Sequence, residues 1–164
     1  MVRAEHWRDD RQQGTFDALN EVVVSRGGPA HVIRLATFIN HSYLTTYTAD
    51  GMILSTPTGS TAYALAAGGP ILPPELKNLL LIPVAPHLSL DRAIVLSEGE
   101  RVRLDIQTTQ VAVLSVDGQF NIELINGDSV IIGTSPYVSR FLRLQERTYF
   151  YKTLLQRLGW PQIK

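Results

Sequence analysis

The chain has 164 residues, no formal net charge, and 45% hydrophobic residues, which is typical of one globular domain with a sizeable core. The charge balance gives no global field for nucleic acid or a membrane surface, so we expect neither partner, and local donors must hold any anionic ligand. The absence of cysteine excludes disulfides and thiolate metal sites and fits a cytoplasmic protein. No apolar run approaches the ~18 residues that a membrane helix needs.

Residues 1–15 are polar, and Trp7 is their only large apolar side chain. We therefore expect a linker or a strand remnant here, with the folded domain covering residues 16–164. Four strands are then predicted, at residues 20–25, 31–40, 43–48 and 52–55, because β-branched and aromatic residues are concentrated there.

A short helix is predicted near residues 60–67, after the Pro57–Gly59 loop, with Thr58 or Ser60 as its cap and Gly68 at its end. Further strands are predicted at 79–84, 93–96, 101–106, 111–116, 120–125 and 129–132, joined by turn sequences that suit antiparallel connections. Large apolar side chains at helical spacing predict a C-terminal helix near 148–158. The fold class is therefore mainly β, an antiparallel β-sandwich with two helices.

The segment 50–71, DGMILSTPTGSTAYALAAGGPI, is the most informative part of the chain. Its small residues let a main chain approach a ligand closely, and its hydroxyls and free N–H groups could bind an anion at the start of the helix. The alternative is a tight strand-to-helix turn with a capping hydroxyl. The glycine spacing fits neither a P-loop nor the dinucleotide fingerprint of a Rossmann fold.

Three other groups could carry chemistry. Asp50 could accept hydrogen bonds from a ribose or an amide, or could simply belong to an Asp-Gly turn. Asn20-Glu21 could grip a sugar diol, or could solvate the end of a strand. A hydrolase built from Ser60, a histidine and Asp117 is a minor alternative, because no nucleophile-elbow sequence is present. The four scattered histidines have no zinc-site spacing, so we expect no metal ligands in the chain.

Four blocks, in this order, resemble the C-terminal domain of the NAD kinases. They are Asn20-Glu21 with the three valines that follow, the 50–70 segment, the Pro86-His87 to Arg92 run, and Asp117-Gly118-Gln119. The resemblance covers roughly residues 16–160, and the 50–70 block is its most specific part. It implies the β-sandwich of that domain and disfavours the simple capped turn.

NAD kinases transfer the terminal phosphate of ATP, or in some members of polyphosphate, to the 2′-hydroxyl of the adenosine ribose of NAD, assisted by Mg²⁺ or another divalent cation. The resemblance implies that Asp50 binds the nicotinamide side and that further contacts to NAD come from Asn20, Glu21, Ser60, Thr61, Ala62 and Tyr63. His87 and Arg92 are candidates for a phosphate or interface contact. The resemblance also implies a homodimer or homotetramer.

The chain departs from the family in two places. It contains no Gly-Gly-Asp-Gly motif, whose aspartate is thought to activate the attacking hydroxyl in an N-terminal α/β domain, so we assign no catalytic residue and expect residues 1–15 to be a remnant next to that missing domain. The order of hydroxyl residues after His87 also differs. Because phosphoryl transfer depends on positioning and charge neutralisation, we expect the chain alone to bind NAD(P) with little or no catalysis. The alternatives are a non-catalytic nucleotide-binding or oligomerisation module, or a relative of the lipid and sphingoid kinases.

Overall fold

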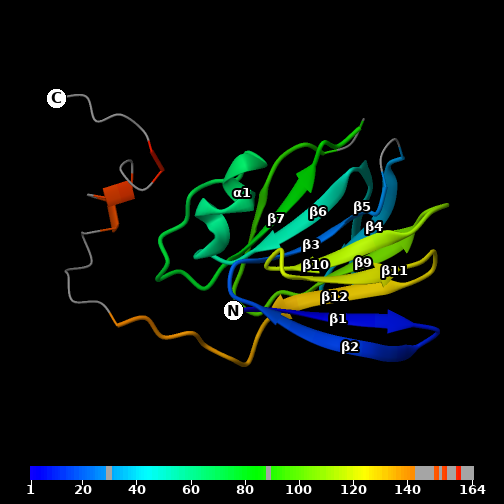
Figure 1. Ribbon diagram of the computed structural model, residues 1–164, viewed down its shortest axis with the longest axis horizontal. Coiled ribbons are helices and arrows are strands. Elements are labelled where there is room, and N and C mark those ends of the chain that lie inside the picture. The colour runs from blue at the N-terminus through cyan, green and yellow to red at the C-terminus, as the bar shows by residue number, and fades with distance from the viewer. Residues whose placement is uncertain (29–30, 88–89, 143–149, 152, 155–157, 160–164) are drawn as a thin grey trace.

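The computed structural model describes all residues except 29–30, 88–89, 143–149, 152, 155–157 and 160–164. It is a sandwich of two six-stranded sheets in which every strand pair is antiparallel (Figure 1). The first sheet holds, in spatial order, β2 (Arg11–Ala18), β1 (Val2–Arg8), β12 (Ser129–Thr134), β9 (Val102–Gln107), β4 (Ile33–Ile39) and β5 (Ser42–Ala49). The second holds β11 (Phe120–Leu124), β10 (Ala112–Val116), β3 (Glu21–Arg26), β6 (Gly51–Ser55), β7 (Leu79–Val84) and β8 (Ile94–Leu96).

The main core lies between the two sheets, because alternate residues of most strands point inward. On β9, for example, Val102, Leu104 and Ile106 are buried while the residues between them face outward. The mainly β sandwich predicted from the sequence is confirmed. Strands predicted at 20–25 and 79–84 correspond to β3 and β7, within one residue at either end.

A second, smaller hydrophobic cluster lies on the outer face of the second sheet. Ile53 of β6 and Ile82 of β7 pack there against Ala64 and Leu72 from the segment that follows β6. The β6 and β7 strands are therefore buried on both faces. This covering segment leaves the outer face of β3 and β10 uncovered, and that uncovered surface is where the candidate site lies.

Residues 1–15, for which a linker or a strand remnant was expected, belong to two strands. They make the β1–β2 hairpin, and β1 pairs with β12 inside the first sheet. Its inward residues Val2 and Ala4 are fully buried, and His6 is 4% exposed beside the buried Asp128 carboxylate. The sequence did not identify β1 as a half-buried strand, because two of its three inward residues are small or polar and the hydrophobic alternation is weak.

The predicted helix at 60–67 is shorter and divided. A 3₁₀ turn, η1 (Gly59–Thr61), precedes a single α-helical turn, α1 (Tyr63–Ala66). Neither Thr58 nor Ser60 caps it, and the Gly59 N–H instead donates to the Thr56 hydroxyl at 3.1 Å. The helix predicted near 148–158 falls largely outside the described residues. Within the described part of the chain, no helix is long and apolar enough to cross a membrane.

Candidate functional site

Two adjoining cavities, which together we call the β3 groove, lie over the outer face of β3. Their volumes are about 380 Å³ and about 450 Å³, within the range of small-molecule sites. Both are lined by Val23, Ser25, Arg26, Gly27 and Tyr63. The first extends toward Asp50, Gly51 and Val84, and the second toward Glu21, Val113, Ser115, Asp117, Gly118 and Asn121.

Glu21 is the most unusual polar group of the groove. Its side chain is only 8% exposed, and its Oε2 atom is buried without a hydrogen-bond partner in the described structure. Burial raises the pKa of the Glu21 carboxyl, and the nearby charge of Asp117 raises it further. A buried, unpaired carboxyl oxygen costs stability, and because the residue that carries it lines a cavity, Glu21 is the groove's first candidate for a ligand contact.

The neighbouring Asn20 contributes mainly through its backbone. Its carbonyl accepts hydrogen bonds from the Thr56 N–H at 2.8 Å and from the Ser55 hydroxyl at 3.3 Å. The Asn20 side chain does not line either cavity. Of the predicted Asn20-Glu21 pair, the structure therefore brings only Glu21 to the groove wall.

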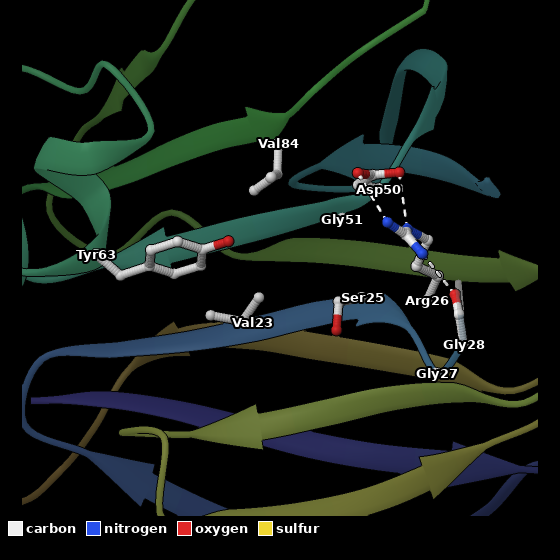
Figure 2. Close-up of a pocket in the computed structure, with 9 residues that line it drawn as sticks. All are labelled: Val23, Ser25, Arg26, Gly27, Gly28, Asp50, Gly51, Tyr63 and Val84. Atoms are coloured by element: carbon white, nitrogen blue, oxygen red, sulfur yellow. Dashed lines mark hydrogen bonds and ion pairs between the residues drawn. The ribbon is translucent and has the colours of Figure 1, made fainter. Parts of the chain in front are cut away.

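Asp50 lies at the other end of the groove, paired with Arg26 (Figure 2). The guanidinium donates to both carboxylate oxygens, from Nε at 2.8 Å and from Nη2 at 3.3 Å, and its Nη1 donates to the Gly28 carbonyl at 2.6 Å. Both side chains are about one-third exposed. The pair offers an approaching ligand both a cation and the remaining lone pairs of a carboxylate.

Tyr63 is the member of the Ser60–Tyr63 block that faces the groove. Its ring lies between Val84 and Val23, with the hydroxyl directed toward the Arg26–Asp50 pair (Figure 2). The side chain is 46% exposed, so a flat ligand group could stack on it. Its position at the start of α1 places this ring beside β3.

The other three residues of that block do not line the groove. Ser60 is fully buried, and its hydroxyl donates to the Pro57 carbonyl at 2.7 Å and accepts from the Leu72 N–H at 2.9 Å. The Thr61 hydroxyl is directed to the Thr58 carbonyl at 3.5 Å, and the Ala62 N–H donates to the Gly59 carbonyl at 2.8 Å. These residues fold the loop that carries Tyr63.

His87 and Arg92 also lie away from the groove. The His87 backbone N–H donates to the Thr48 carbonyl at 2.7 Å, and its side chain is exposed. The Arg92 side chain is 84% exposed and pairs with its neighbour Asp91 at 3.5 Å. The minor hydrolase alternative has no support, because the Ser60 hydroxyl bonds to backbone groups of Pro57 and Leu72 and to no histidine in the described part of the chain.

The acidic side chains of the groove do not form a metal site. Asp50 is paired with Arg26, and both carboxylate oxygens of Asp117 accept backbone N–H groups. Across the described ranges, no group of three or more histidine, aspartate or glutamate side chains is placed to hold a metal ion. The residues therefore do not fit a metal ion held by the protein alone.

Sequence reasoning did not select Val23, Ser25 and Arg26 as site residues. The signal was available, because Glu21, Val23 and Ser25 alternate along one face of a predicted strand. Once Glu21 is placed in a site, the two residues at spacing two must share its side of the sheet. Arg26 gave no comparable signal, since its pairing with Asp50 depends on the β3–β6 register.

The fold and the groove define a β-sandwich domain with a cavity of small-molecule size on the open half of an outer sheet face. Residues 19–144 match the family model of the ATP-NAD kinase C-terminal domain. The chain therefore belongs to the NAD kinase family, as the resemblance of its sequence motifs predicts.

Curated relatives of the chain are also NAD kinases. The chain is 46% identical to an NAD kinase of Chloroflexus aggregans over 158 aligned residues. The aligned region covers 96% of this chain and 57% of the relative. The chain is 38% identical over 159 residues to an NAD kinase of Carboxydothermus hydrogenoformans, covering 96% and 56%. The chain thus spans a little over half the length of these relatives.

Two solved structures share the fold. One is yeast NADH kinase complexed with NADH, with a TM-score of 0.72 and 36% identity, covering 80% of this chain and 39% of that one. The other is an NAD kinase from Archaeoglobus fulgidus in complex with ATP, with a TM-score of 0.77 and 27% identity, covering 96% and 59%.

Proposed function

We propose that this chain is the NAD-binding part of an NAD kinase, a phosphotransferase that makes NADP from NAD. In the whole enzyme, the terminal phosphate of ATP or polyphosphate would pass to the 2′-hydroxyl of the adenosine ribose. The observation that carries the proposal is the carboxyl of Glu21, a residue that lines the β3 groove and whose Oε2 atom is buried with no hydrogen-bond partner in the described structure. A ribose hydroxyl is a donor that would satisfy it.

The shape and polarity of the groove support a dinucleotide. It consists of two adjoining cavities, which suits a ligand with two nucleoside halves. The Tyr63 ring, shared by both cavities, offers a stacking surface for a base. At the far end, the Arg26–Asp50 pair offers a carboxylate oxygen for an amide N–H and a guanidinium for an anionic group. A chain of zero net charge would thus hold an anionic ligand through local donors.

In this proposal the chain binds and orients NAD, and it does not activate the attacking hydroxyl. Of the acids that line the groove, Asp50 is paired with Arg26, Asp117 accepts backbone N–H groups and Glu21 is assigned to the ribose, and the Gly-Gly-Asp-Gly motif is not in the sequence. A divalent cation, Mg²⁺ in the usual case, would come with the phosphates of ATP and neutralise their charge. Ser60, Thr61 and Ala62 would act by shaping the loop that presents Tyr63.

Titration calorimetry with NAD, NADH, NADP and ATP tests the proposal on the purified chain. We expect binding of the dinucleotides and a loss of affinity of about 10- to 100-fold in Glu21→Ala, since hydrogen bonds to charged groups contribute about 1.5–3 kcal/mol. Glu123→Ala is the matched control, because Glu123 is an exposed glutamate on β11 that does not line the groove. Equal affinities of the two variants would contradict the assignment of Glu21.

Activity gives a second test. With NAD, ATP and Mg²⁺ we expect negligible NADP from the chain alone, and NADP formation when a Gly-Gly-Asp-Gly domain is added in trans. Robust synthesis by the chain alone would overturn the division of roles. If sphingoid or lipid substrates bind instead of NAD, the assignment of the substrate fails.

We also infer that the protein assembles as a homodimer or homotetramer and works in the cytoplasm. Large apolar side chains are exposed outside the groove, among them Val95 (51%), Phe120 (64%) and Val138 (75%), and such groups are common at subunit interfaces. Light scattering coupled to gel filtration measures the mass directly, and a monomer at micromolar concentration would contradict the assembly.

A further inference from the structure

The turn that carries Glu21 is held from one side by Asp117. The Asp117 Oδ2 atom accepts the Leu19 N–H at 2.7 Å, and Oδ1 accepts the N–H groups of Asn20 and Glu21 at 2.8 and 3.0 Å. The Asp117 N–H in turn donates to the Glu21 carbonyl at 3.0 Å. Four hydrogen bonds therefore connect one aspartate to three consecutive residues, about a hundred positions away in the chain.

The same turn is held from the other side by Thr56. Its hydroxyl donates to the Leu19 carbonyl at 2.7 Å, and its N–H donates to the Asn20 carbonyl at 2.8 Å. The three N–H groups of the turn and the Glu21 carbonyl thus bond to Asp117, whereas the Leu19 and Asn20 carbonyls bond to Thr56. These bonds fix the backbone from which the Glu21 side chain extends, and the Oε2 atom of its carboxyl adds no hydrogen bond within the described structure.

The backbone at Asp117 is built for this role. Asp117 has a φ of 49° and Gly118 a φ of 67°, which makes the tight turn between β10 and β11. Aspartate and asparagine tolerate this left-handed conformation better than other side chains with a Cβ. The turn brings the carboxylate back over the start of β3, where it also lines the groove.

We propose that Asp117 is a positioning residue of the β3 groove, which fixes the backbone of residues 19–21 and thereby places the Glu21 carboxyl for its ligand. The identity of that ligand as a dinucleotide rests on the proposed function. The positioning itself rests only on the hydrogen bonds of the turn. Asp117 thus affects ligand binding in two ways: it positions Glu21, and its negative charge raises the pKa of the Glu21 carboxyl.

The charge of Asp117 gives a signature that a purely structural clamp would lack. It adds to the effect of burial in raising the pKa of Glu21. The other titratable or charged groups that line this cavity are Arg26 and Tyr63. Removing the negative charge of Asp117 should therefore lower the pKa of Glu21, and any pH dependence of binding that comes from Glu21 should move to lower pH.

Asp117→Asn is the informative substitution. It keeps the size of the side chain and its tolerance of a positive φ, but its amide nitrogen must face the Leu19 N–H, so that one acceptor is lost. We expect NAD affinity to fall roughly tenfold and the midpoint of its pH profile to move down. Glu100→Gln is the matched control, since Glu100 accepts the Ser97 N–H at 2.6 Å in an exposed turn outside the groove.

Amide hydrogen exchange of residues 19–21, followed by NMR, reads the positioning without a ligand. We expect faster exchange at Leu19 and Asn20 in Asp117→Asn, with the core strands unchanged. If the wild-type chain binds no dinucleotide, the proposed function fails, and the exchange result alone then decides the role of Asp117. NAD affinity within twofold of wild type with an unmoved pH profile, or unchanged exchange at residues 19–21, would overturn the inference.

Discussion

The closest backbone approach near the β3 groove is at Gly59, and it gives a sharp prediction for Gly59→Ala. A Cβ at this position would lie 2.3 Å from the Asn20 carbonyl oxygen and 2.6 Å from the Ser55 hydroxyl, whereas ordinary contacts begin near 3.4 Å. The obstacle is backbone, so it cannot rotate away. The loop and the 19–21 turn must separate by about 1 Å to accept one methyl group.

The cost of that separation can be estimated from the contacts it breaks. Overpacking of this kind costs about 1–3 kcal/mol. The Asn20 carbonyl also accepts hydrogen bonds from the Thr56 N–H and the Ser55 hydroxyl, and each bond that lengthens adds about 1 kcal/mol. We therefore expect Gly59→Ala to lower the free energy of unfolding by about 3 kcal/mol, a large share of the ~5–15 kcal/mol of a typical domain.

Urea denaturation followed by circular dichroism at pH 7 and 25 °C measures this loss. Gly28→Ala is the matched control, because a Cβ there meets only the Gln110 Oε1 atom, at 3.6 Å, and should change stability by less than about 0.5 kcal/mol. NAD affinity should fall in Gly59→Ala, because moving Asn20 moves Glu21. A stability loss below about 1 kcal/mol with unchanged NAD affinity would refute the reasoning.

Three further substitutions test buried polar groups. Burial alone would raise the pKa of Asp128, but hydrogen bonds from Arg8, the Ile125 N–H and His6 hold it at about 2. The ionised carboxylate therefore adds about 2 kcal/mol to the free energy of unfolding above pH 4, and this contribution is lost as the pH falls through 2. In Asp128→Asn, urea denaturation should show that this contribution is lost. The free energy of unfolding should also depend less on pH between pH 2 and 4 than in the wild type. Tyr47→Phe should stabilise the fold by about 1 kcal/mol in thermal melts, because the buried Tyr47 hydroxyl has no partner among the described residues. A loss of stability would contradict this expectation. Burial and the charge of Asp117 raise the pKa of Glu21, so the folded state disfavours its ionised form. The resulting loss of stability is absent below the unfolded pKa of ~4 and grows as the pH rises. The stability of Glu21→Ala relative to wild type should therefore increase from pH 4 to 8.

The strands that the sequence predicted well are those with a regular hydrophobic signal. Val102, Leu104 and Ile106 alternate with polar residues, and β9 follows from them almost to the residue. The β1–β2 hairpin could not be found in this way, because its inward positions include Ala4 and His6. What stabilises that hairpin is pairing with β12 and the ion pair of Arg8 with Asp128, and both depend on residues more than a hundred positions away.

The residues predicted for the site are only partly brought together. Glu21, Asp50 and Tyr63 all line the groove, whereas Ser60, a residue of the same motif as Tyr63, is fully buried and does not line it. From the sequence, the hydroxyls of that motif were expected either to cap the helix or to contact NAD. Which hydroxyl faces a ligand and which binds Pro57 and Leu72 depends on how the loop returns across β6 and β7, and no local pattern specifies that return.

The structure also changes the explanation of why this motif is rich in small residues. The close approach is between two segments of the protein, since Gly59 abuts the Asn20 carbonyl and Thr56 bonds to the 19–21 turn. Because Asp117 holds the opposite side of that turn, the loop and the aspartate act on Glu21 from two directions. Substitutions in this loop should therefore weaken binding even where the altered side chain cannot reach the ligand. Their effects should not add to those of Asp117→Asn, since both act through one displaced carboxyl.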